Sequence, residues 1–327
     1  MHIRDALQAG LRTLIEQHVP SAQLAAELLL MYVLGCDRGY LHSHPETEVA
    51  PETADRYFRL IAERATGKPT QYITGHQDFW GLDFEVTPDV LIPRPETEHV
   101  VEAVIDLSRH LGAVSAGLTG QKGKGRAEES PRAAFSPFTP FPLCPFDSPL
   151  PACRIVDVGT GSGCIALALA SVLAEAEIYA TDISHPALAV AAGNAARLGL
   201  RGRVKFKEGD LLAPLLDAGL SGTFDFVASN PPYVAQSELD RVQREVREFE
   251  PRIAWGGLER GEQIYSQLFP QALDALKPGG YAVVEIGYNM RDRVCALLGR
   301  GWSETEVRPD LAGISRVVIA RKAVNSP

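Results

Sequence analysis

The first 65 residues carry apolar side chains at three- and four-residue spacing, which is typical of one face of an α-helix. The spacing is clearest at Leu7, Leu11, Leu14, Leu24 and Leu28. Pro51 is a typical helix start and Gly35 a typical helix stop. The pattern predicts a small helical domain over residues 1–70, either without chemistry of its own or with a role in docking a partner.

A different pattern follows over residues 71–90. Alternating apolar and polar positions from Phe79 to Val86, with Gly81 among them, predict a β-hairpin that links the helical domain to the rest of the chain. Pro95 then suits the first turn of a helix. Apolar residues at Val101 and Val104 continue that helix.

From residue 154 onward, apolar strands alternate with helical segments. The predicted strands cover residues 154–158, 177–182, 204–206, 224–229, 281–286 and 316–320. This alternation predicts an α/β fold over residues 91–327, with a mostly parallel, Rossmann-like sheet and helices on both faces. Residues 112–151 lose all periodicity and include seven prolines from Pro131 to Pro151, so they are predicted to be an irregular insertion.

Composition narrows the class of protein. The chain is 45% hydrophobic and 22% charged, as in a globular protein, and its longest apolar stretch, residues 164–174, is too short to cross a bilayer. Asp5 stands where a secretory signal begins its apolar core, which predicts a cytoplasmic protein. The net charge of -9 disfavours nucleic-acid binding. The five cysteines show neither zinc-site nor disulfide spacing, so no metal is expected.

A glycine-rich turn, Gly159-Thr160-Gly161-Ser162-Gly163, separates a buried strand from an apolar helix. Glycines let a backbone turn tightly and approach a ligand, so this is a candidate nucleotide-type cofactor loop, with a dinucleotide site or a plain turn as alternatives. Asp182 ends the next strand, where a carboxylate can accept hydrogen bonds from both ribose hydroxyls of an adenosine group. Asp210 and Leu211 follow the third strand, where an adenine fits, although Asp210 is equally well interpreted as a helix cap.

The segment Asn230-Pro231-Pro232-Tyr233 follows the fourth strand, at the sheet edge where open α/β folds bind ligands. Its prolines stiffen the backbone, so the Asn230 side-chain oxygen and a main-chain carbonyl can both accept hydrogen bonds from one NH2 group. Tyr233 offers a flat face for stacking. The segment is predicted to hold a planar amide or amino nitrogen, whose activation needs positioning and electrostatics rather than a metal or a covalent nucleophile.

Together these motifs resemble the HemK/PrmC family, protein-(glutamine-N5) methyltransferases that act on peptide chain release factors. The resemblance covers nearly the whole chain and includes residues 68–75, 92–98, 249–252, 256–257 and 310–314. The segment Ile92-Pro93-Arg94-Pro95-Glu96-Thr97-Glu98 is its most specific part, because the N-P-P-Y segment is shared with adenine-N6 methyltransferases.

The resemblance implies a class I methyltransferase sheet, S-adenosyl-L-methionine as cofactor, and methyl transfer to N5 of the glutamine in a Gly-Gly-Gln loop. It implies that the cofactor is contacted by Gly159 to Gly163, Asp182, Asp210, Leu211 and Asn230. Asn230 to Tyr233 would hold the glutamine, with Asn230, Pro231 and Tyr233 as catalytic residues. Leu91, Pro93 and Arg94 would border the pocket, and the helical domain would dock the release factor.

Two features depart from the family: the insertion over residues 112–151, and Leu211 where some relatives carry an aromatic residue beside the adenine. Arg94 and Glu98 are interpreted either as a structural ion pair or as substrate contacts. The nearest alternative is an adenine-N6 or other nucleic-acid amino methyltransferase, against which the acidic charge and residues 92–98 count. A nicotinamide-dependent oxidoreductase, or an idle adenosine-binding module, would leave Asn230 to Tyr233 without a task.

Overall fold

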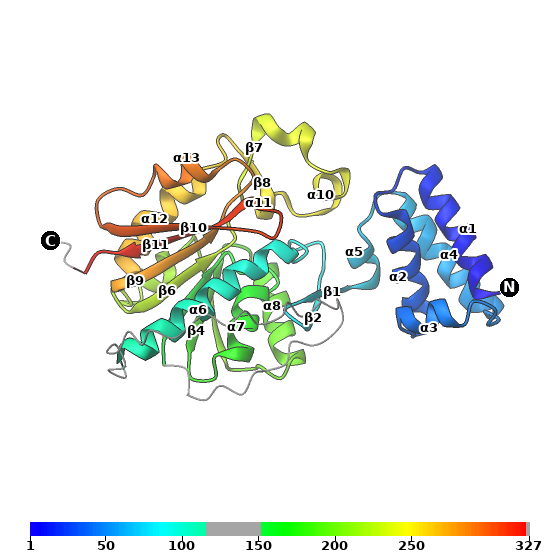
Figure 1. Ribbon diagram of the computed structural model, residues 1–327, viewed down its shortest axis with the longest axis horizontal. Coiled ribbons are helices and arrows are strands. Elements are labelled where there is room, and N and C mark those ends of the chain that lie inside the picture. Colours follow the sequence, from blue (N-terminus) through cyan, green and yellow to red (C-terminus); the bar gives the residue numbers. More distant parts are fainter. Residues whose placement is uncertain (116–151, 325–327) are drawn as a thin grey trace, which may run out of the picture.

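The computed structural model describes residues 1–115 and 152–324. A bundle of helices at the N-terminal end stands beside a larger α/β body, and a narrow connection joins the two (Figure 1). The predicted insertion falls mostly outside the described residues. Its first positions, up to Ser115, continue helix α6 (Glu98–Ser115).

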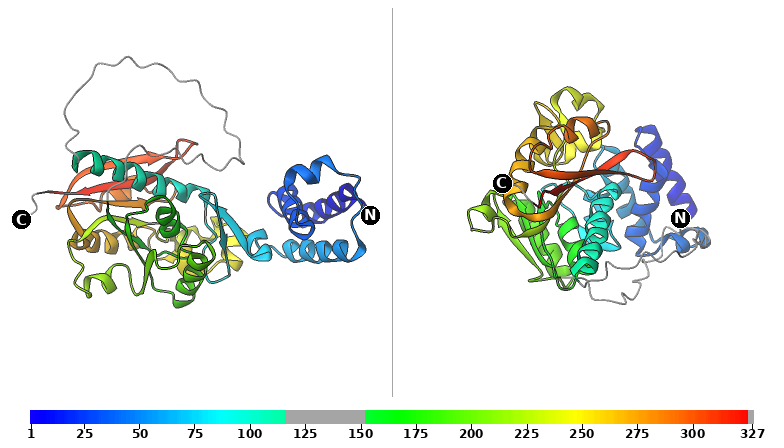
Figure 2. Two further views of the ribbon diagram at one scale, coloured as in Figure 1. Left: turned by 90° about the horizontal axis from the view of Figure 1, so that it is seen from below. Right: turned by 60° about the vertical axis from the view of Figure 1, so that its left-hand side comes forward.

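The N-terminal helices are α1 (Ile3–Glu16), α2 (Ala22–Leu34), α3 (Arg38–Ser43), α4 (Pro51–Ala65) and α5 (Thr70–Thr74). They enclose a core of their own, in which Leu29 and Tyr57 are fully buried. Gly35 ends α2 with a φ of 65°, a conformation that favours glycine at a helix stop. The last turns of this region lead directly into the α/β body (Figure 2).

Strands β1 (His76–Phe79) and β2 (Leu82–Glu85) form an antiparallel hairpin. Trp80 and Gly81 make its two-residue turn with φ values of 55° and 70°, the positive pair that matches the twist of the flanking strands. The hairpin is shorter than the segment 71–90 in which the sequence placed it, because residues 70–74 form helix α5 instead.

The α/β body is built on a sheet of seven strands among the described residues, in the order β10-β11-β9-β6-β3-β4-β5. Five of them are parallel: β3 (Arg154–Val158), β4 (Glu177–Asp182), β5 (Val204–Glu208), β6 (Phe224–Ser229) and β9 (Leu276–Glu285). Strand β11 (Ser315–Lys322) runs antiparallel between β9 and β10 (Trp302–Pro309). The sequence did not predict β10, because this edge strand is mostly exposed and lacks an apolar pattern.

Helices cover both faces of the sheet, which confirms the predicted Rossmann-like class. Helix α6, with α7 (Cys164–Val172) and α8 (His185–Arg197), packs on one face. On the other face lie α9 (Ala213–Leu216), α12 (Gln263–Ala275) and α13 (Arg291–Cys295). None of the helices that the structure describes is long and apolar enough to cross a membrane.

Between β6 and α12 the chain makes an excursion over residues 230–262. It contains β7 (Val234–Ala235), η2 (Gln236–Arg241), α10 (Arg244–Phe249), α11 (Arg252–Trp255) and β8 (Gly256–Leu258). Helix α10 contacts the end of the bundle: Arg64 of α4 pairs with Glu245, and Arg244 Nη2 donates to the Thr66 carbonyl at 2.9 Å. The excursion therefore touches both parts of the molecule.

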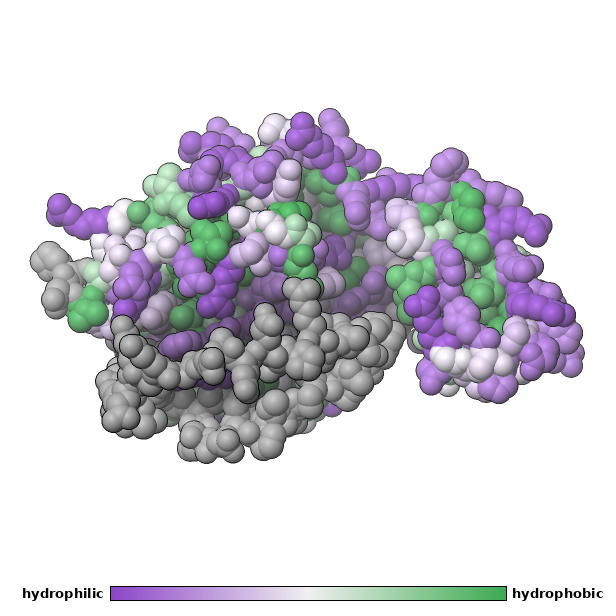
Figure 3. Space-filling view, in the orientation of Figure 1, coloured by the Kyte–Doolittle hydropathy of each residue, from purple (hydrophilic) through white to green (hydrophobic). Residues whose placement is uncertain are grey.

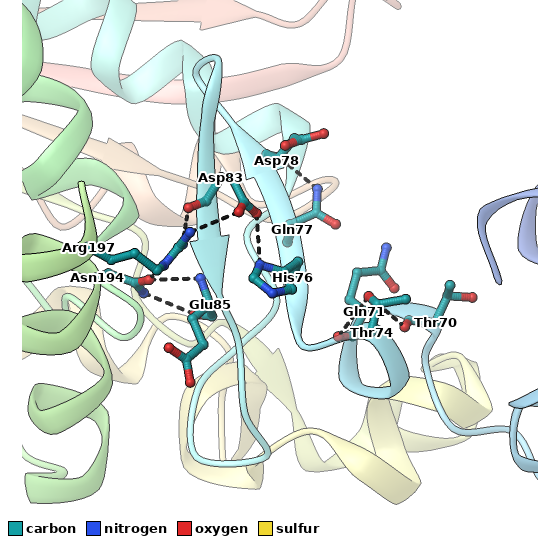
Figure 4. A network of polar contacts seen from close by, with 10 residues as sticks. All are labelled: Thr70, Gln71, Thr74, His76, Gln77, Asp78, Asp83, Glu85, Asn194 and Arg197. Carbon is teal, nitrogen blue, oxygen red and sulfur yellow. Dashed lines mark hydrogen bonds and ion pairs between the residues drawn. The ribbon is translucent and has the colours of Figure 1, made fainter. Parts of the chain in front are cut away.

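Helix α8 is fastened to the hairpin by Asn194, whose side chain is fully buried. Its Oδ1 accepts a hydrogen bond from the Glu85 amide at 2.7 Å, and its Nδ2 donates to the carbonyls of Glu85 and Ser162 at 3.0 Å each. One turn further along, Arg197 pairs with Asp83 at 2.8 Å, so both α8 side chains reach the same strand (Figure 4). Because Ser162 belongs to the glycine-rich turn, Asn194 ties the hairpin to the candidate cofactor loop.

Replacing Asn194 by alanine is expected to lower the free energy of unfolding by about 2–4 kcal/mol, because it leaves a buried amide N–H and two carbonyls without their partner. Urea denaturation measures the change. Gln77→Ala is the control, since Gln77 makes only a local bond to the Asp78 carbonyl, and its effect should stay below about 0.5 kcal/mol. An Asn194→Ala loss no larger than that of the control would contradict the prediction.

Candidate active site

The register of the parallel strands brings four loops to one edge of the sheet. Val158 at the end of β3 lies opposite Ser229 of β6 on one side and Thr181 of β4 on the other. Ser229 also lies opposite Val284 of β9, and its Oγ donates to the Val158 carbonyl at 2.7 Å. The residues that follow these positions therefore meet at the carboxyl edge, where open α/β folds bind ligands.

The glycines of the turn after β3 have separate roles. Gly159, Gly161 and Gly163 all have positive φ, at 71°, 56° and 85°. A Cβ at Gly159 or Gly161 would meet no atom within 4 Å, so open space lies beside this backbone. A Cβ at Gly163 would come within 3.1 Å of Leu167 and 3.2 Å of Ala191, so this glycine lets helices α7 and α8 pack closely. Gly159 and Gly161 thus leave room for a ligand and are called the glycine cradle below, while Gly163 allows the helices beneath them to pack.

Asp157, next to the end of β3, lies fully buried under the turn. Its Oδ2 accepts hydrogen bonds from Thr160 Oγ1 at 2.7 Å and from the Ala166 amide at 3.1 Å, which fixes the shape of the turn. Its Oδ1 is buried without a partner among the described residues. Burial raises the pKa of this carboxyl to about 7. Asp157 was not among the site residues predicted from the sequence, although an acid inside an apolar strand is an unusual feature.

Asp182, at the end of β4, lies against the same turn. Its Oδ2 accepts a hydrogen bond from the Gly161 amide and its Oδ1 one from the Ser184 amide, each at 2.8 Å. Burial raises the pKa of this carboxyl, and the two amide bonds oppose the shift. Each oxygen keeps a further lone pair for a ligand. The structure thus brings the predicted ribose acceptor and the glycine cradle together.

Asp210 and Leu211 follow β5. Leu211 has a positive φ of 48° and is half-buried, packed on the core of the second sheet face. Asp210 is exposed, and the cap of helix α9 is Leu212, without any side-chain capping bond. The interpretation of Asp210 as a helix cap is therefore wrong, while the contact of these two residues with an adenine stays a prediction.

Asn230 follows β6 and is joined to two buried residues. Its Nδ2 donates to Thr97 Oγ1 at 2.9 Å, and Thr97 Oγ1 donates to Glu285 Oε2 at 2.6 Å. Thr97 and Glu285 are each only 2% exposed. Burial raises the pKa of the Glu285 carboxyl to about 7. Neither residue was among the predicted site residues, although Thr97 lies inside the specific segment 92–98 and Glu285 is an acid at the end of an apolar strand.

Tyr233 is held by close backbone packing. A Cβ on Gly287 would lie 2.7 Å from Tyr233 Cδ2, and one on Gly261 would lie 2.5 Å from the Tyr233 carbonyl oxygen. Burial raises the pKa of the Tyr233 hydroxyl, so the ring is neutral at ordinary pH. Gly287 thus leaves room for the Tyr233 ring and Gly261 for its backbone, and neither glycine was predicted from the sequence.

The segment before η1 (Pro95–Thr97) borders the same edge. Leu91 is half-buried and Pro93 buried. Arg94 pairs with Glu250 of the excursion, whose Oε2 also accepts a hydrogen bond from the Ile92 amide at 3.3 Å. An ion pair between Arg94 and Glu98 is therefore not formed. Glu98 instead accepts a hydrogen bond from the amide of Trp80 in the hairpin turn at 2.7 Å.

Among the described residues, no group of three or more His, Cys, Asp or Glu side chains is arranged to hold a metal ion. The sheet order, with its antiparallel strand beside the edge, and the glycine cradle next to an N-P-P-Y segment define a class I methyltransferase.

Comparison with known proteins identifies the particular family. The PrmC N-terminal domain model matches residues 5–75, and a methyltransferase domain model matches residues 150–297. The chain is 43% identical to a release factor glutamine methyltransferase of Koribacter versatilis, over 98% of this chain and 99% of that protein. It is 38% identical to one of Moorella thermoacetica, over 98% of both. The chain belongs to the release factor glutamine methyltransferase family, which confirms the resemblance.

Gly287→Ala is expected to lower the rate of methyl transfer about 10- to 100-fold, because the new methyl group must displace the Tyr233 ring, and small misplacements at a site of this kind are costly. Steady-state kinetics measure the change. Gly193→Ala is the matched control, since Gly193 is an exposed position of α8 where a Cβ meets nothing within 4 Å. Equal rates for the two variants would show that Tyr233 does not need this packing.

The raised pKa of Glu285 predicts a dependence of stability on pH. The folded protein holds this proton more tightly than the unfolded chain, so the contribution to stability is complete in acid and is lost as the pH rises towards about 7. Arg316 and Arg94 oppose the shift and Glu96 adds to it. When the pH rises from 5 to 7.5, the free energy of unfolding of the parent protein should therefore fall by about 1–3 kcal/mol more than that of Glu285→Gln. Urea denaturation at the two pH values measures the fall, and an equal fall in both proteins would refute the prediction.

Proposed function

We propose that this protein transfers a methyl group from S-adenosyl-L-methionine to the side-chain amide nitrogen, N5, of the glutamine in the Gly-Gly-Gln loop of peptide chain release factors. The observation that carries the proposal is the Asn230 amide, fixed by Thr97 at the sheet edge beside the glycine cradle. The names of the relatives support the choice of a release-factor glutamine over an adenine. A cytoplasmic location is part of the proposal, because release factors act there.

The residues present fit the cofactor. Space beside Gly159 and Gly161 accommodates a ligand against bare backbone, and Asp182 supplies acceptors for ribose hydroxyls. The unpartnered, buried Oδ1 of Asp157 keeps the floor of this cradle polar. Asp210 and Leu211 are assigned to the adenine. When bound, the cofactor supplies an electrophilic methyl group carried on a positively charged sulfur.

The Asn230 to Tyr233 segment is assigned to the glutamine. An amide nitrogen is a poor nucleophile because its lone pair is delocalised, so the protein has to act by position and charge. The Asn230 oxygen and the main-chain carbonyl of Pro231 accept the two hydrogens of the NH2 group and stabilise positive charge on the nitrogen. Pro232 holds the turn and Tyr233 offers its ring face. The extra proton leaves to solvent, so no side chain is assigned as a base.

The helical bundle is assigned to docking the release factor. Its large exposed apolar side chains are Met1, Ile15, Leu24, Tyr32 and Tyr40. In the space-filling view, apolar side chains gather on the visible face of the bundle, including the side turned towards the α/β body (Figure 3). A partner bound there faces the carboxyl edge of the sheet, where the segment Asn230 to Tyr233, the clamp, lies. Leu91, Pro93 and the paired Arg94 border the approach.

A methyl-transfer assay tests the proposal. The protein is incubated with methyl-labelled S-adenosyl-L-methionine and one of three acceptors: a release factor, the same factor with Ala for the loop glutamine, or DNA. Label is expected on the intact release factor alone, and mass spectrometry should place it on the glutamine. Label on DNA would establish the alternative, an adenine or other nucleic-acid amino methyltransferase. Equal label on the Ala variant would exclude the loop glutamine.

Asn230→Ala should lower kcat about 100-fold or more, because removing one preorganised group that stabilises the transition state costs about that much. The dissociation constant of the cofactor should stay within about tenfold, as measured by calorimetry. Asn289→Gly is the control and should retain full activity, because Asn289 is exposed and glycine tolerates its positive φ of 59°. Loss of cofactor binding in Asn230→Ala would show that Asn230 mainly builds the cofactor pocket.

A further inference from the structure

The side chain of Asn230 has two chemically different ends, and only one of them suits the proposed reaction. Its Oδ1 can accept a hydrogen from a substrate NH2 group, whereas its Nδ2 would point two donors at that group and repel it. Among the described residues, only Thr97 Oγ1 bonds to this amide, at 2.9 Å from Nδ2. A threonine hydroxyl both donates and accepts, so Thr97 alone would tolerate either orientation of the amide.

Glu285 removes that freedom. Above its raised pKa of about 7, Glu285 is an ionised carboxylate and only accepts, so Thr97 then gives its single hydrogen to Glu285 Oε2, at 2.6 Å. The Thr97 oxygen is then left to accept, and the end of Asn230 that faces it has to be Nδ2. The direction of both hydrogen bonds, from Asn230 to Thr97 and from Thr97 to Glu285, is therefore set by Glu285. The Glu285 backbone is fixed in turn by the Tyr265 hydroxyl, which donates to its carbonyl at 2.7 Å.

We propose that Thr97 and Glu285 are positioning residues that hold the Asn230 amide with its oxygen towards the substrate nitrogen. The proposal rests on the proposed function, because it gives Asn230 the task of accepting from an NH2 group. It adds to that function a role for two residues outside the N-P-P-Y segment. It also explains why a polar pair occupies a buried position, where each group needs a partner to offset its loss of hydration.

Thr97→Val and Thr97→Ser form a matched pair of variants. Valine keeps the branched shape and loses the hydroxyl, while serine keeps the hydroxyl and loses a methyl group. Thr97→Val should lower kcat about 10- to 100-fold, with the cofactor dissociation constant within about twofold of the parent value. Thr97→Ser should recover kcat to within about threefold. A purely structural role predicts the reverse order, since serine leaves a small cavity and valine does not.

Glu285→Gln is the second variant, and it stays informative if Thr97→Val fails to fold. A glutamine can accept from Thr97 through its oxygen or donate to it through its nitrogen, so the direction of the hydrogen bonds from Asn230 through Thr97 is no longer fixed. The expected result is a two- to tenfold fall in kcat with unchanged cofactor binding. Full kcat in Glu285→Gln, or in Thr97→Val, would overturn the proposal.

A readout without any acceptor separates this proposal from the proposed function. The chain has four asparagines, at 194, 230, 289 and 325, so selective ¹⁵N labelling resolves their side-chain amides by NMR. The Asn230 amide hydrogens should exchange with water more slowly than those of the exposed Asn289, and this protection should vanish in Thr97→Val. Unprotected Asn230 hydrogens in the parent protein overturn the proposal. Absence of label on the release factor, with protection intact, overturns only the proposed function.

Discussion

The parallel alignment of β4, β3, β6 and β9 is the constraint on which the rest of the site depends. In such a sheet the strands end at the same edge, and their register decides which residues become neighbours. Val158, Ser229 and Val284 lie in one row across three strands. The next residues along the chain are Gly159, Asn230 and Glu285. They belong to the glycine cradle, to the clamp and to the buried hydrogen bonds that hold Asn230. Three separate segments of the chain come together at this edge because the apolar strands that precede them are aligned in parallel.

This constraint also explains how much the sequence could predict. Each strand end could be located from its own apolar run and from the glycine, acid or proline that follows it, so the sequence predicted the glycine-rich turn, Asp182 and the N-P-P-Y segment at strand ends, where they lie. The pairing of Asn230 with Thr97 and of Arg94 with Glu250 was not, because no local pattern states which partner a polar side chain has across the fold. Strand β10 was missed for a related reason, since an exposed edge strand carries no apolar signal.

Two buried acids, Asp157 and Glu285, lie among apolar residues below the site, and each fixes a neighbouring part of it by hydrogen bonds. Asp157 fixes the turn that makes the cradle, through Thr160 and the amide of Ala166. Glu285 fixes the threonine that holds the clamp. Each costs stability near neutral pH, because burial raises its pKa to about 7. A protein selected for stability alone would place apolar side chains there, so the position of both acids under the same edge points to the precision that the site requires.

The excursion over residues 230–262 joins the clamp to the bundle. It begins with Asn230 itself, pairs Glu245 with Arg64 at the end of α4, and pairs Glu250 with Arg94 beside the pocket. Arg64 and Glu250 are both nearly buried, so these ion pairs are shielded from solvent and hold their geometry better than exposed pairs do. If the bundle docks the release factor and Asn230 holds its glutamine, as proposed, the distance between these two points is set by this short segment, which is anchored at both ends. A long protein substrate can then be held at two points without a flexible hinge between them, which lowers the entropy lost in bringing its loop to the methyl group.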